Sequence, residues 1–351
     1  MFQIADPEPR QAGLRGADHV AGAADGQIFF GDAARPEFLK RCGLETAPAL
    51  VVTMARGSSD NAALYFKYLF ELKTGIPVAS VGPSIASVYE RELRLDRAAC
   101  LSISQSGKSP DLVAFQKMAG DQRALNLALV NTLDSPLAEG ADCLMPVASG
   151  PEKSVAATKS FVMSQTAIAA LTAHVSRDDG LLAALADLPG ALDRAIGCDW
   201  RDLVTRLKPV HSLYVIGRGP GLAIAQEAAL KLKETCEKHA ESYSSAEVLH
   251  GPIQLAASGL AALVFLSRDE ARQGLIDAVR RMAEMGIAVF VADPAGDRPL
   301  DLPGVSYLPC AAAPHPMLDC ISQITTFYVF AERFAFDLGL DPDSPKLLKN
   351  C

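Results

Sequence analysis

Residues 101–111 read Leu-Ser-Ile-Ser-Gln-Ser-Gly-Lys-Ser-Pro-Asp, and the rest of the chain can be interpreted outward from them. Leu101 and Ile103 are apolar and fit the end of a buried strand. Small and polar residues then form a turn. Pro110 suits the first position of a helix, because proline lacks the N–H that would have no partner there. The stretch therefore predicts a strand, a serine-rich loop and a helix that begins at the loop.

This loop has the composition of an anion site. Backbone N–H groups at a helix N-terminus, the positive end of the helix dipole and several hydroxyls together favour a small anion, above all a phosphate ester. The side chains available are those of Ser104, Gln105, Ser106 and Ser109. An ordinary strand–helix unit with a serine cap has the same pattern, so this stretch leaves both interpretations open.

Length, composition and charge exclude several classes of protein. The chain has 351 residues, enough for two domains, and 49% of them are hydrophobic. Its net charge of −8 argues against non-specific nucleic-acid binding, which needs a basic face. The eight cysteines form no C-x-x-C pair, and no group of cysteines and histidines has the spacing of a zinc site. The sequence shows neither a signal peptide nor an apolar run long enough to cross a bilayer. We therefore expect a cytoplasmic protein with no metal, cofactor, nucleic-acid or membrane partner.

Strand and helix patterns alternate along the first half. Strands are expected at 49–54, 78–81, 127–130 and 143–147, besides the one that ends at Ser104. A helix that includes Leu64 and Leu72 should stop at Gly75, and a long helix should start near Ser154. This alternation predicts an α/β fold with parallel sheets.

The second half repeats the first at a constant distance. Arg56-Gly57 recurs as Arg218-Gly219, 162 residues later, and three strands recur with the same shift. We infer two duplicated α/β domains joined by helices across roughly 175–210. Their expected limits are a lead-in at 1–35, domains at 36–175 and 176–335, and a tail at 336–351. The serine loop is present once, because Leu-Ser-Arg-Asp stands at 266–269 in the second half.

A second group of polar residues lies at 226–252. Glu227, Lys231 and Glu234 share one face of a helix. A solvated ladder of ion pairs is one interpretation of that spacing. The other is a proton-transfer site, because His250 follows in a polar loop, and histidine titrates near neutral pH.

Several ordered motifs resemble the sugar isomerase (SIS) domain family, specifically the isomerase half of glucosamine-6-phosphate synthase. They are Arg-Gly-Ser-Ser at 56–59, Ser-Gln-Ser-Gly at 104–107, Val-Ala-Ala-Thr-Lys-Ser-Phe at 155–161, Gly-Arg-Gly at 217–219, and Ala-Leu-Lys-Leu-Lys-Glu, His-Ala-Glu and His-Gly-Pro within 229–252. The resemblance covers about residues 45–349, and it implies two tandem SIS domains.

The resemblance also implies roles for single residues. The sugar 6-phosphate would be held by Ser58, Ser59, Ser104, Gln105, Ser106 and Ser109. Val155 and Ala157 would line the sugar. Glu234 would move a proton between C1 and C2 with Lys231 beside it, and His250 would open the ring from the neighbouring subunit of a homodimer. One positioned carboxylate and one histidine suffice for this chemistry without a metal.

The departures from the synthase shape the functional expectation. The chain starts Met-Phe and goes almost directly to the repeat, without the synthase's glutaminase domain, so we expect ammonia release rather than ammonia production from glutamine. Lys108 and Ser109 replace the usual Glu-Thr. The tail from Asp341 to Cys351, in contrast, resembles the synthase tail, and this implies a lysine that enters the site and can form a Schiff base, with Lys349 as the candidate. A disordered basic terminus is the alternative.

The expected function is an enzyme that converts glucosamine 6-phosphate to fructose 6-phosphate and ammonia. Alternatives are a ketose/aldose phosphosugar isomerase, a fructosamine-6-phosphate deglycase, and a phosphosugar-sensing regulator.

The glycines at 217, 219 and 221 do not make a dinucleotide-binding fingerprint, because the third glycine falls one place early.

Overall fold

Two parallel sheets of five strands each organise residues 50–348, the part of the chain that the computed structural model describes (for 256–258, the backbone only). The first sheet has the order β2-β1-β3-β4-β5 and contains β1 (Leu50–Met54), β2 (Val78–Ser80), β3 (Ala98–Ser104), β4 (Leu125–Val130) and β5 (Cys143–Pro146). The second has the order β7-β6-β8-β9-β10 and contains β6 (Ser212–Gly217), β7 (His239–Ser244), β8 (Ala261–Phe265), β9 (Ala288–Ala292) and β10 (Val305–Leu308). The predicted α/β fold is confirmed.

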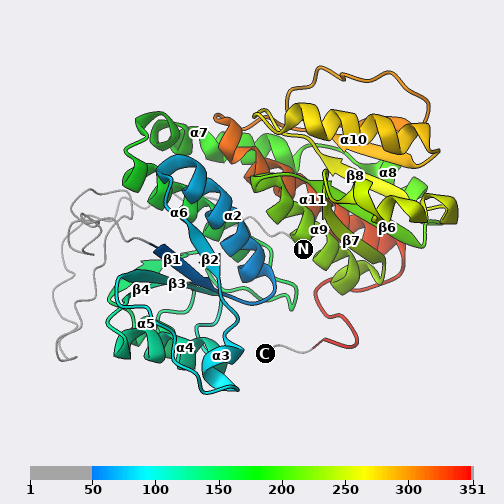
Figure 1. Cartoon of the computed structure of the whole chain (residues 1–351). Helices are drawn as coiled ribbons and strands as arrows, with labels where there is room; N and C mark the ends of the chain where they lie inside the picture. Colours follow the sequence, from blue (N-terminus) through cyan, green and yellow to red (C-terminus); the bar gives the residue numbers. More distant parts are fainter. Residues whose placement is uncertain (1–49, 349–351) are drawn as a thin grey trace, which may run out of the picture.

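Helices connect and cover the strands (Figure 1). In the first half they are α2 (Ser58–Thr74), α3 (Ser84–Ser87), α4 (Pro110–Asp121), α5 (Pro136–Glu139) and α6 (Lys159–Ser176). Two helices follow between the sheets in sequence, α7 (Asp179–Ile196) and α8 (Arg201–Leu207). The second half has α9 (Pro220–Cys236), α10 (Arg272–Glu284) and α11 (Asp319–Asp337), with short 3₁₀ turns η1 (Val248–His250), η2 (Pro252–Ser258) and η3 (Pro316–Leu318).

The duplication inferred from the 162-residue shift is visible in the backbone. Helices α2 and α9 both have 17 residues and begin 162 positions apart. Each follows a glycine with the same uncommon conformation, φ 55° and ψ −131° at Gly57 and φ 56° and ψ −134° at Gly219. Glycine adopts positive φ without the steric cost that a Cβ would bring. The two halves therefore make the same turn from strand into helix.

Four of the helices form a layer between the two sheets that both halves share. Helices α2, α6, α9 and α11 contribute to one continuous hydrophobic core with the inner faces of both sheets, and α2 packs directly on α9. A second core joins α4 and α5 to the outer face of the first sheet, and a third joins α10 to the outer face of the second. The inner strands of each sheet are buried on both faces, which explains why their sequences are apolar runs rather than alternating patterns. The interface between the halves is thus built from helices, with α2 and α9 at its centre.

One predicted boundary is wrong. The long helix expected near Ser154 begins at Lys159, because Glu152 caps its N-terminus. The Glu152 carboxylate accepts the backbone N–H of Ser160 at 2.9 Å and its hydroxyl at 2.9 Å. Residues 154–158, which were expected to be helical, form a loop instead. The predicted lead-in at 1–35 lies outside the described residues, and the domain limits stay predictions.

Candidate active site

The two loops of the predicted phosphate site meet at one point of the first sheet. Strands β1 and β3 are neighbours in this sheet, with Met54 paired to Ser102, and the helices that follow them cover opposite faces. In an open parallel sheet such a switch point leaves a crevice beyond the carboxyl ends of the strands, where ligands bind. Ser58 and Ser59 follow β1, and the loop at 104–109 follows β3. The fold therefore brings these two segments to the same crevice.

The loop after β3 is held in shape by its own hydrogen bonds. The Ser104 hydroxyl accepts the Gly107 N–H at 3.0 Å, and the Ser106 hydroxyl accepts the Lys108 N–H at 3.3 Å. Gly107 has φ +66°, and a Cβ there would lie 2.2 Å from the Ser135 Oγ. Only glycine fits this position. The hydroxyl protons of Ser104 and Ser106 remain available as donors, since both oxygens act as acceptors in these bonds.

An ion pair connects the two loops. The Arg56 guanidinium, just before α2, donates to the Asp111 carboxylate in the first turn of α4. The Arg56 side chain is 60% exposed, whereas that of Asp111 is 15% exposed. The two helix N-termini have no side-chain caps, so their first N–H groups form a setting that favours an anion.

A buried polar cluster lies where α2 packs on α9. The Lys231 ammonium contacts the Ser58 Oγ at 3.0 Å, Glu234 at 2.6 Å and Glu227 at 3.4 Å. Glu227 also accepts hydrogen bonds from the Asn61 amide at 2.8 Å and from the Tyr328 hydroxyl at 3.0 Å. We call these six residues the Lys231 cluster. It joins the start of α2 in the first half to α9 and α11 in the second.

Burial separates the roles of the two carboxylates. The Glu227 side chain is fully buried and that of Lys231 is 3% exposed, whereas that of Glu234 is 23% exposed. This arrangement is not a solvated ladder. Burial alone would lower the pKa of Lys231, but Glu227 and Glu234 outweigh it, and the pKa lies above the usual lysine value. Lys231 is therefore a fixed cation, and Glu234 is the carboxylate of the cluster that a solute can reach.

The corresponding loop of the second half, after β8, is held by its own ion pair and hydrogen bonds. The Asp269 carboxylate accepts the Ser267 hydroxyl at 2.5 Å and the Ala271 N–H at 2.9 Å. Arg268 donates to both oxygens of Asp319 at 2.7 Å. These carboxylates occupy donors of the kind an anion would use.

The remaining predicted residues lie apart from the Lys231 cluster or outside the described residues. His250 is exposed in η1, and its ring makes no hydrogen bond with any residue of the range 50–348. Val155 and Ala157 lie in the loop before α6, where the Val155 N–H donates to Asp343 O at 3.5 Å. The tail thus docks beside this loop, but Lys349 lies outside the described residues.

Sequence reasoning missed Asn61 and Tyr328 as partners of Glu227. Asn61 lies among apolar and aromatic residues on the buried face of α2, so a polar residue on that face was an available signal. The buried face of α11 carries several polar side chains, so Tyr328 did not stand out in the same way. Burial and the nearby Glu227 raise the pKa of Tyr328 well above its usual value, so its hydroxyl stays a donor. The pairings themselves span 166 and 101 residues and depend on the packing of helices.

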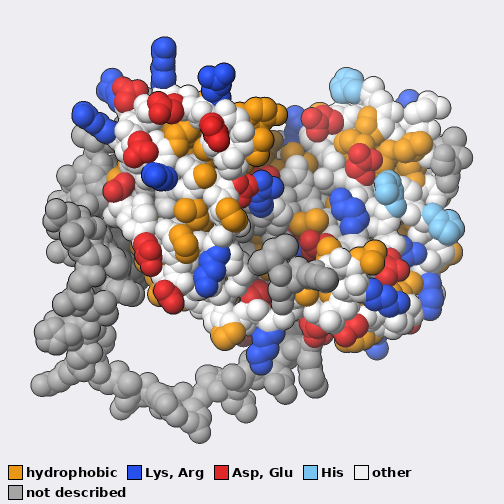
Figure 2. All heavy atoms as spheres, turned by 90° about the horizontal axis from the view of Figure 1, so that it is seen from below, with side chains coloured by type: hydrophobic (Ala, Val, Ile, Leu, Met, Phe, Trp, Pro, Cys, Tyr) orange, Lys and Arg blue, Asp and Glu red, His pale blue; other side chains and the backbone are white. Residues whose placement is uncertain are grey.

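Two searches of the described residues bear on cofactors and membranes. No group of three or more histidine, cysteine or acidic side chains in this range is arranged to hold a metal ion. No helix within 50–348 combines the length and apolar character needed to cross a membrane. Figure 2 shows acidic and basic side chains interspersed on one face of the molecule, without a large basic patch there.

Comparisons with known proteins agree with the fold and its motifs. The chain is 30% identical over 300 residues to the glutamine–fructose-6-phosphate aminotransferase (isomerizing) of Methanothermobacter thermautotrophicus, covering 85% of this chain and 50% of that protein. It therefore spans about half the length of the curated relatives it matches. A provisionally assigned phosphosugar isomerase from Silicibacter pomeroyi DSS-3 is 44% identical with a TM-score of 0.82, covering 89% of this chain and 94% of the other.

A more distant structure shares the fold. Glucosamine-6-phosphate deaminase from Thermotoga maritima is 18% identical with a TM-score of 0.71, covering 90% of this chain and 94% of the other. The family model of the SIS domain matches residues 48–174 and 206–293, one segment in each half. The chain belongs to the SIS domain family, with its two sheets built as tandem SIS domains.

Proposed function

We propose that the chain converts glucosamine 6-phosphate and water into fructose 6-phosphate and ammonia. The observation that supports this best is the contact chain from Ser58 through Lys231 to Glu234. One buried ammonium joins a hydroxyl beside the serine loop to a carboxylate that solutes can reach. A phosphate bound at one end would thereby orient the reacting carbons of the sugar near the other.

The proposed reaction needs two proton-transfer groups. After ring opening, Glu234 takes the proton from C2 and returns it to C1, while a proton passes from the C2 amine to the C1 oxygen. The C1 aldehyde thereby becomes a hydroxymethyl group and the C2 amine becomes an imine. Water adds to that imine, and ammonia leaves with the formation of the C2 ketone. Lys231 holds one oxygen of Glu234, so the other is free to act as the base. The serine loop binds the phosphate and takes no part in the proton transfer.

The relatives support a phosphosugar substrate. The aminotransferase relatives carry fructose 6-phosphate in their names, and the Thermotoga maritima structure is named a glucosamine-6-phosphate deaminase. Isomerisation without loss of the amine would use the same carboxylate and the same serine loop. The release of ammonia is therefore the measurement that separates the two reactions.

Purified protein is incubated with glucosamine 6-phosphate, and ammonia and fructose 6-phosphate are assayed together. Equal amounts are expected, and both should vanish in Glu234→Gln. Glu237→Gln is the matched control, because this exposed residue ends the same helix and should keep full turnover. If wild-type protein binds the substrate but forms neither product, the deaminase proposal fails. Turnover in Glu234→Gln would remove Glu234 from the mechanism.

We also propose that His250 opens the sugar ring in the site of a partner subunit. Within one chain its side chain is exposed and has no hydrogen bond to the Lys231 cluster. Subunits carrying His250→Ala and subunits carrying Glu234→Gln are each expected to be inactive. Mixing them should restore part of the activity in hybrid dimers. No recovery, once subunit exchange has been demonstrated by mass spectrometry, would contradict a shared site.

A further inference from the structure

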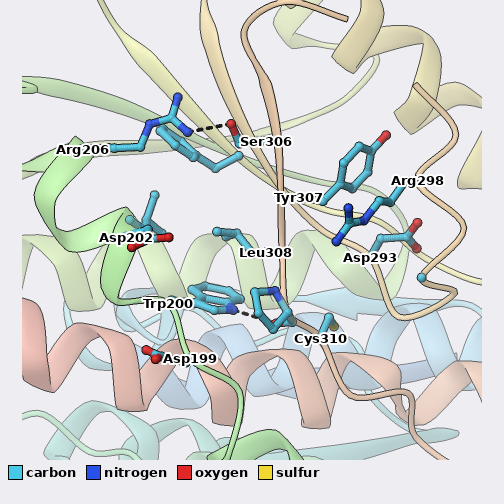
Figure 3. A pocket seen from close by; sticks show the side chains of 14 residues that line it. Asp199, Trp200, Asp202, Arg206, Asp293, Arg298, Ser306, Tyr307, Leu308 and Cys310 are labelled. Carbon is cyan, nitrogen blue, oxygen red and sulfur yellow. Dashed lines mark hydrogen bonds between the residues drawn. The ribbon is translucent and has the colours of Figure 1, made fainter. Parts of the chain in front are cut away.

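A polar cavity of about 480 Å³ lies away from the serine loop, at the free edge of the second sheet. Its walls come from α8, from the edge strand β10 and from the loop after β9 (Figure 3). This volume is within the range of small-molecule sites. None of its lining residues belongs to the Lys231 cluster or to the serine loop. The proposed reaction therefore gives this cavity no role.

One side of the cavity presents an arginine that is already held in position. The Arg206 guanidinium donates to the Ser306 hydroxyl at 2.6 Å, and its central carbon lies 4.5 Å from the centre of the Phe290 ring. These contacts orient the group, but they use only one of its N–H donors. The remaining donors can receive an anion with little loss of side-chain freedom.

The cavity is lined by side chains of both charges, and they differ in whether they are paired. Arg272 makes two contacts of 2.8 Å with the Asp293 carboxylate and also pairs with Asp297. Asp199 pairs with Arg201 and Arg333. Arg206 and Arg298 form no ion pair within the described residues, and Figure 3 shows Arg298 reaching toward the cavity. Two unpaired guanidinium groups at one small cavity favour a ligand with a phosphate group.

The rest of the lining favours a polyol over a nucleotide. Tyr307 accepts the Leu300 N–H at 2.9 Å, so its own proton remains a donor, and the Asp202 carboxylate has no ion-pair partner in the described part of the chain. The Phe290 ring is 2% exposed and the Trp200 side chain 3% exposed. No open ring face of these two residues is left for a base to stack on. Hydroxyl groups, in contrast, can use both the phenol and the carboxylate.

The duplicated half shows that this polarity is a special feature. At a shift of 162 residues, Ser306 and Tyr307 correspond to Leu144 and Met145 of β5, which are buried and apolar. The first half thus packs apolar side chains where the second half lines a cavity with hydroxyls. We propose that this cavity is a second binding site, separate from the one that carries out the reaction, and that it takes a phosphorylated polyol such as an open-chain or cyclic sugar phosphate.

The chain contains a reporter for this site. Trp200 is its one tryptophan, it lines the cavity, and its indole N–H is held by Pro309 O at 2.7 Å. Titrating the full-length protein with glucitol 6-phosphate should give a saturable change in Trp200 fluorescence. The change should persist in Ser104→Ala, because that variant alters only the serine loop. Glucitol without phosphate should give no change.

Two variants test the assigned arginines. Arg206→Gln and Arg298→Asn should each weaken the fluorescence-detected affinity about tenfold or more, since each removes a charge-assisted contact. Asparagine suits position 298, where φ is +47°. Arg280→Gln, an exposed arginine on α10 away from the cavity, is the matched control and should leave the affinity unchanged.

Calorimetry of the same titration should give two binding events per chain in the wild type, one weakened by Ser104→Ala and the other by Arg206→Gln. A single event that only Ser104→Ala weakens would overturn the proposal of a second site while leaving the serine loop intact. A fluorescence change that Arg206→Gln and Arg298→Asn do not affect would overturn it as well. Turnover of glucosamine 6-phosphate plays no part in these readouts, so failure of the deaminase proposal is recognised separately.

Discussion

Replacing Tyr328 by phenylalanine removes one hydroxyl from the Lys231 cluster and nothing else. The hydroxyl donates to Glu227 at 3.0 Å inside a fully buried site, and phenylalanine keeps the ring and its contacts. A hydrogen bond to a charged group contributes about 1.5–3 kcal/mol to stability. The Glu227 carboxylate would retain Asn61 and Lys231 as partners. We therefore expect the free energy of unfolding to fall by that amount.

Tyr65→Phe provides a matched control in the other half. Tyr65 is also fully buried, but its hydroxyl donates to the backbone carbonyl of Met317 at 2.8 Å, and a neutral hydrogen bond contributes only about 0.5–1.5 kcal/mol. Urea unfolding followed by circular dichroism measures both losses. Glu227 positions Lys231, so Tyr328→Phe should also lower kcat. If about 1.4 kcal/mol of the lost hydrogen-bond energy appears in the reaction barrier, kcat falls about tenfold.

The effect on kinetics separates a positioning role from a merely structural one. Tyr328→Phe should lower kcat while leaving KM for the phosphosugar within about twofold, since no group of the serine loop is touched. Tyr65→Phe should leave both parameters unchanged. Equal losses of stability in the two variants, together with an unchanged kcat in Tyr328→Phe, would refute the view that Glu227 works through Lys231.

Three further predictions follow from the site. Ser104→Ala should raise KM about tenfold or more with a smaller change in kcat, because it removes a donor from the phosphate loop; an unchanged KM in steady-state assays would contradict that role. Gly107→Ala should cost about 1–2 kcal/mol from its φ of +66° alone, with more from the contact to Ser135, and should weaken binding of inorganic phosphate measured by calorimetry; full stability would contradict the loop geometry. The raised pKa of Lys231 stabilises the fold fully below the unfolded-state pKa of about 10.4 and loses that effect as pH rises through the higher native pKa. The stability difference between wild type and Lys231→Met should thus stay constant from neutral pH to about 10 and shrink above it, and a difference that shrinks below pH 10 would contradict this linkage.

Much of the architecture was predictable because it is recorded in local patterns. The strand, loop and helix around Ser104 follow from apolar periodicity and from Pro110 at a helix start, and α4 begins at that proline. The constant shift of 162 residues predicts two copies of one topology, which the two strand orders confirm. The start of α6 was placed too early, because the cap comes from Glu152, which lies in the preceding loop.

The candidate site was predictable only in part. Spacing alone puts Glu227, Lys231 and Glu234 on one helical face, and it puts serines at the ends of two strands. The spacing does not tell whether that helical face is buried or exposed to solvent. The packing of α2 and α11 on α9 decided this, since it buries Glu227 and Lys231 and leaves Glu234 partly exposed.

The sequence by itself determined the α/β class, the duplication and the serine loop, because these depend on periodicity and turn chemistry within short segments. Only the tertiary structure decided which polar groups meet. Asn61 reaches Glu227 across 166 residues and Tyr328 across 101, and the cavity beside β10 is polar where its counterpart in the first half is packed. Burial and pairing of charges arise between elements distant in sequence, so no local pattern specifies them.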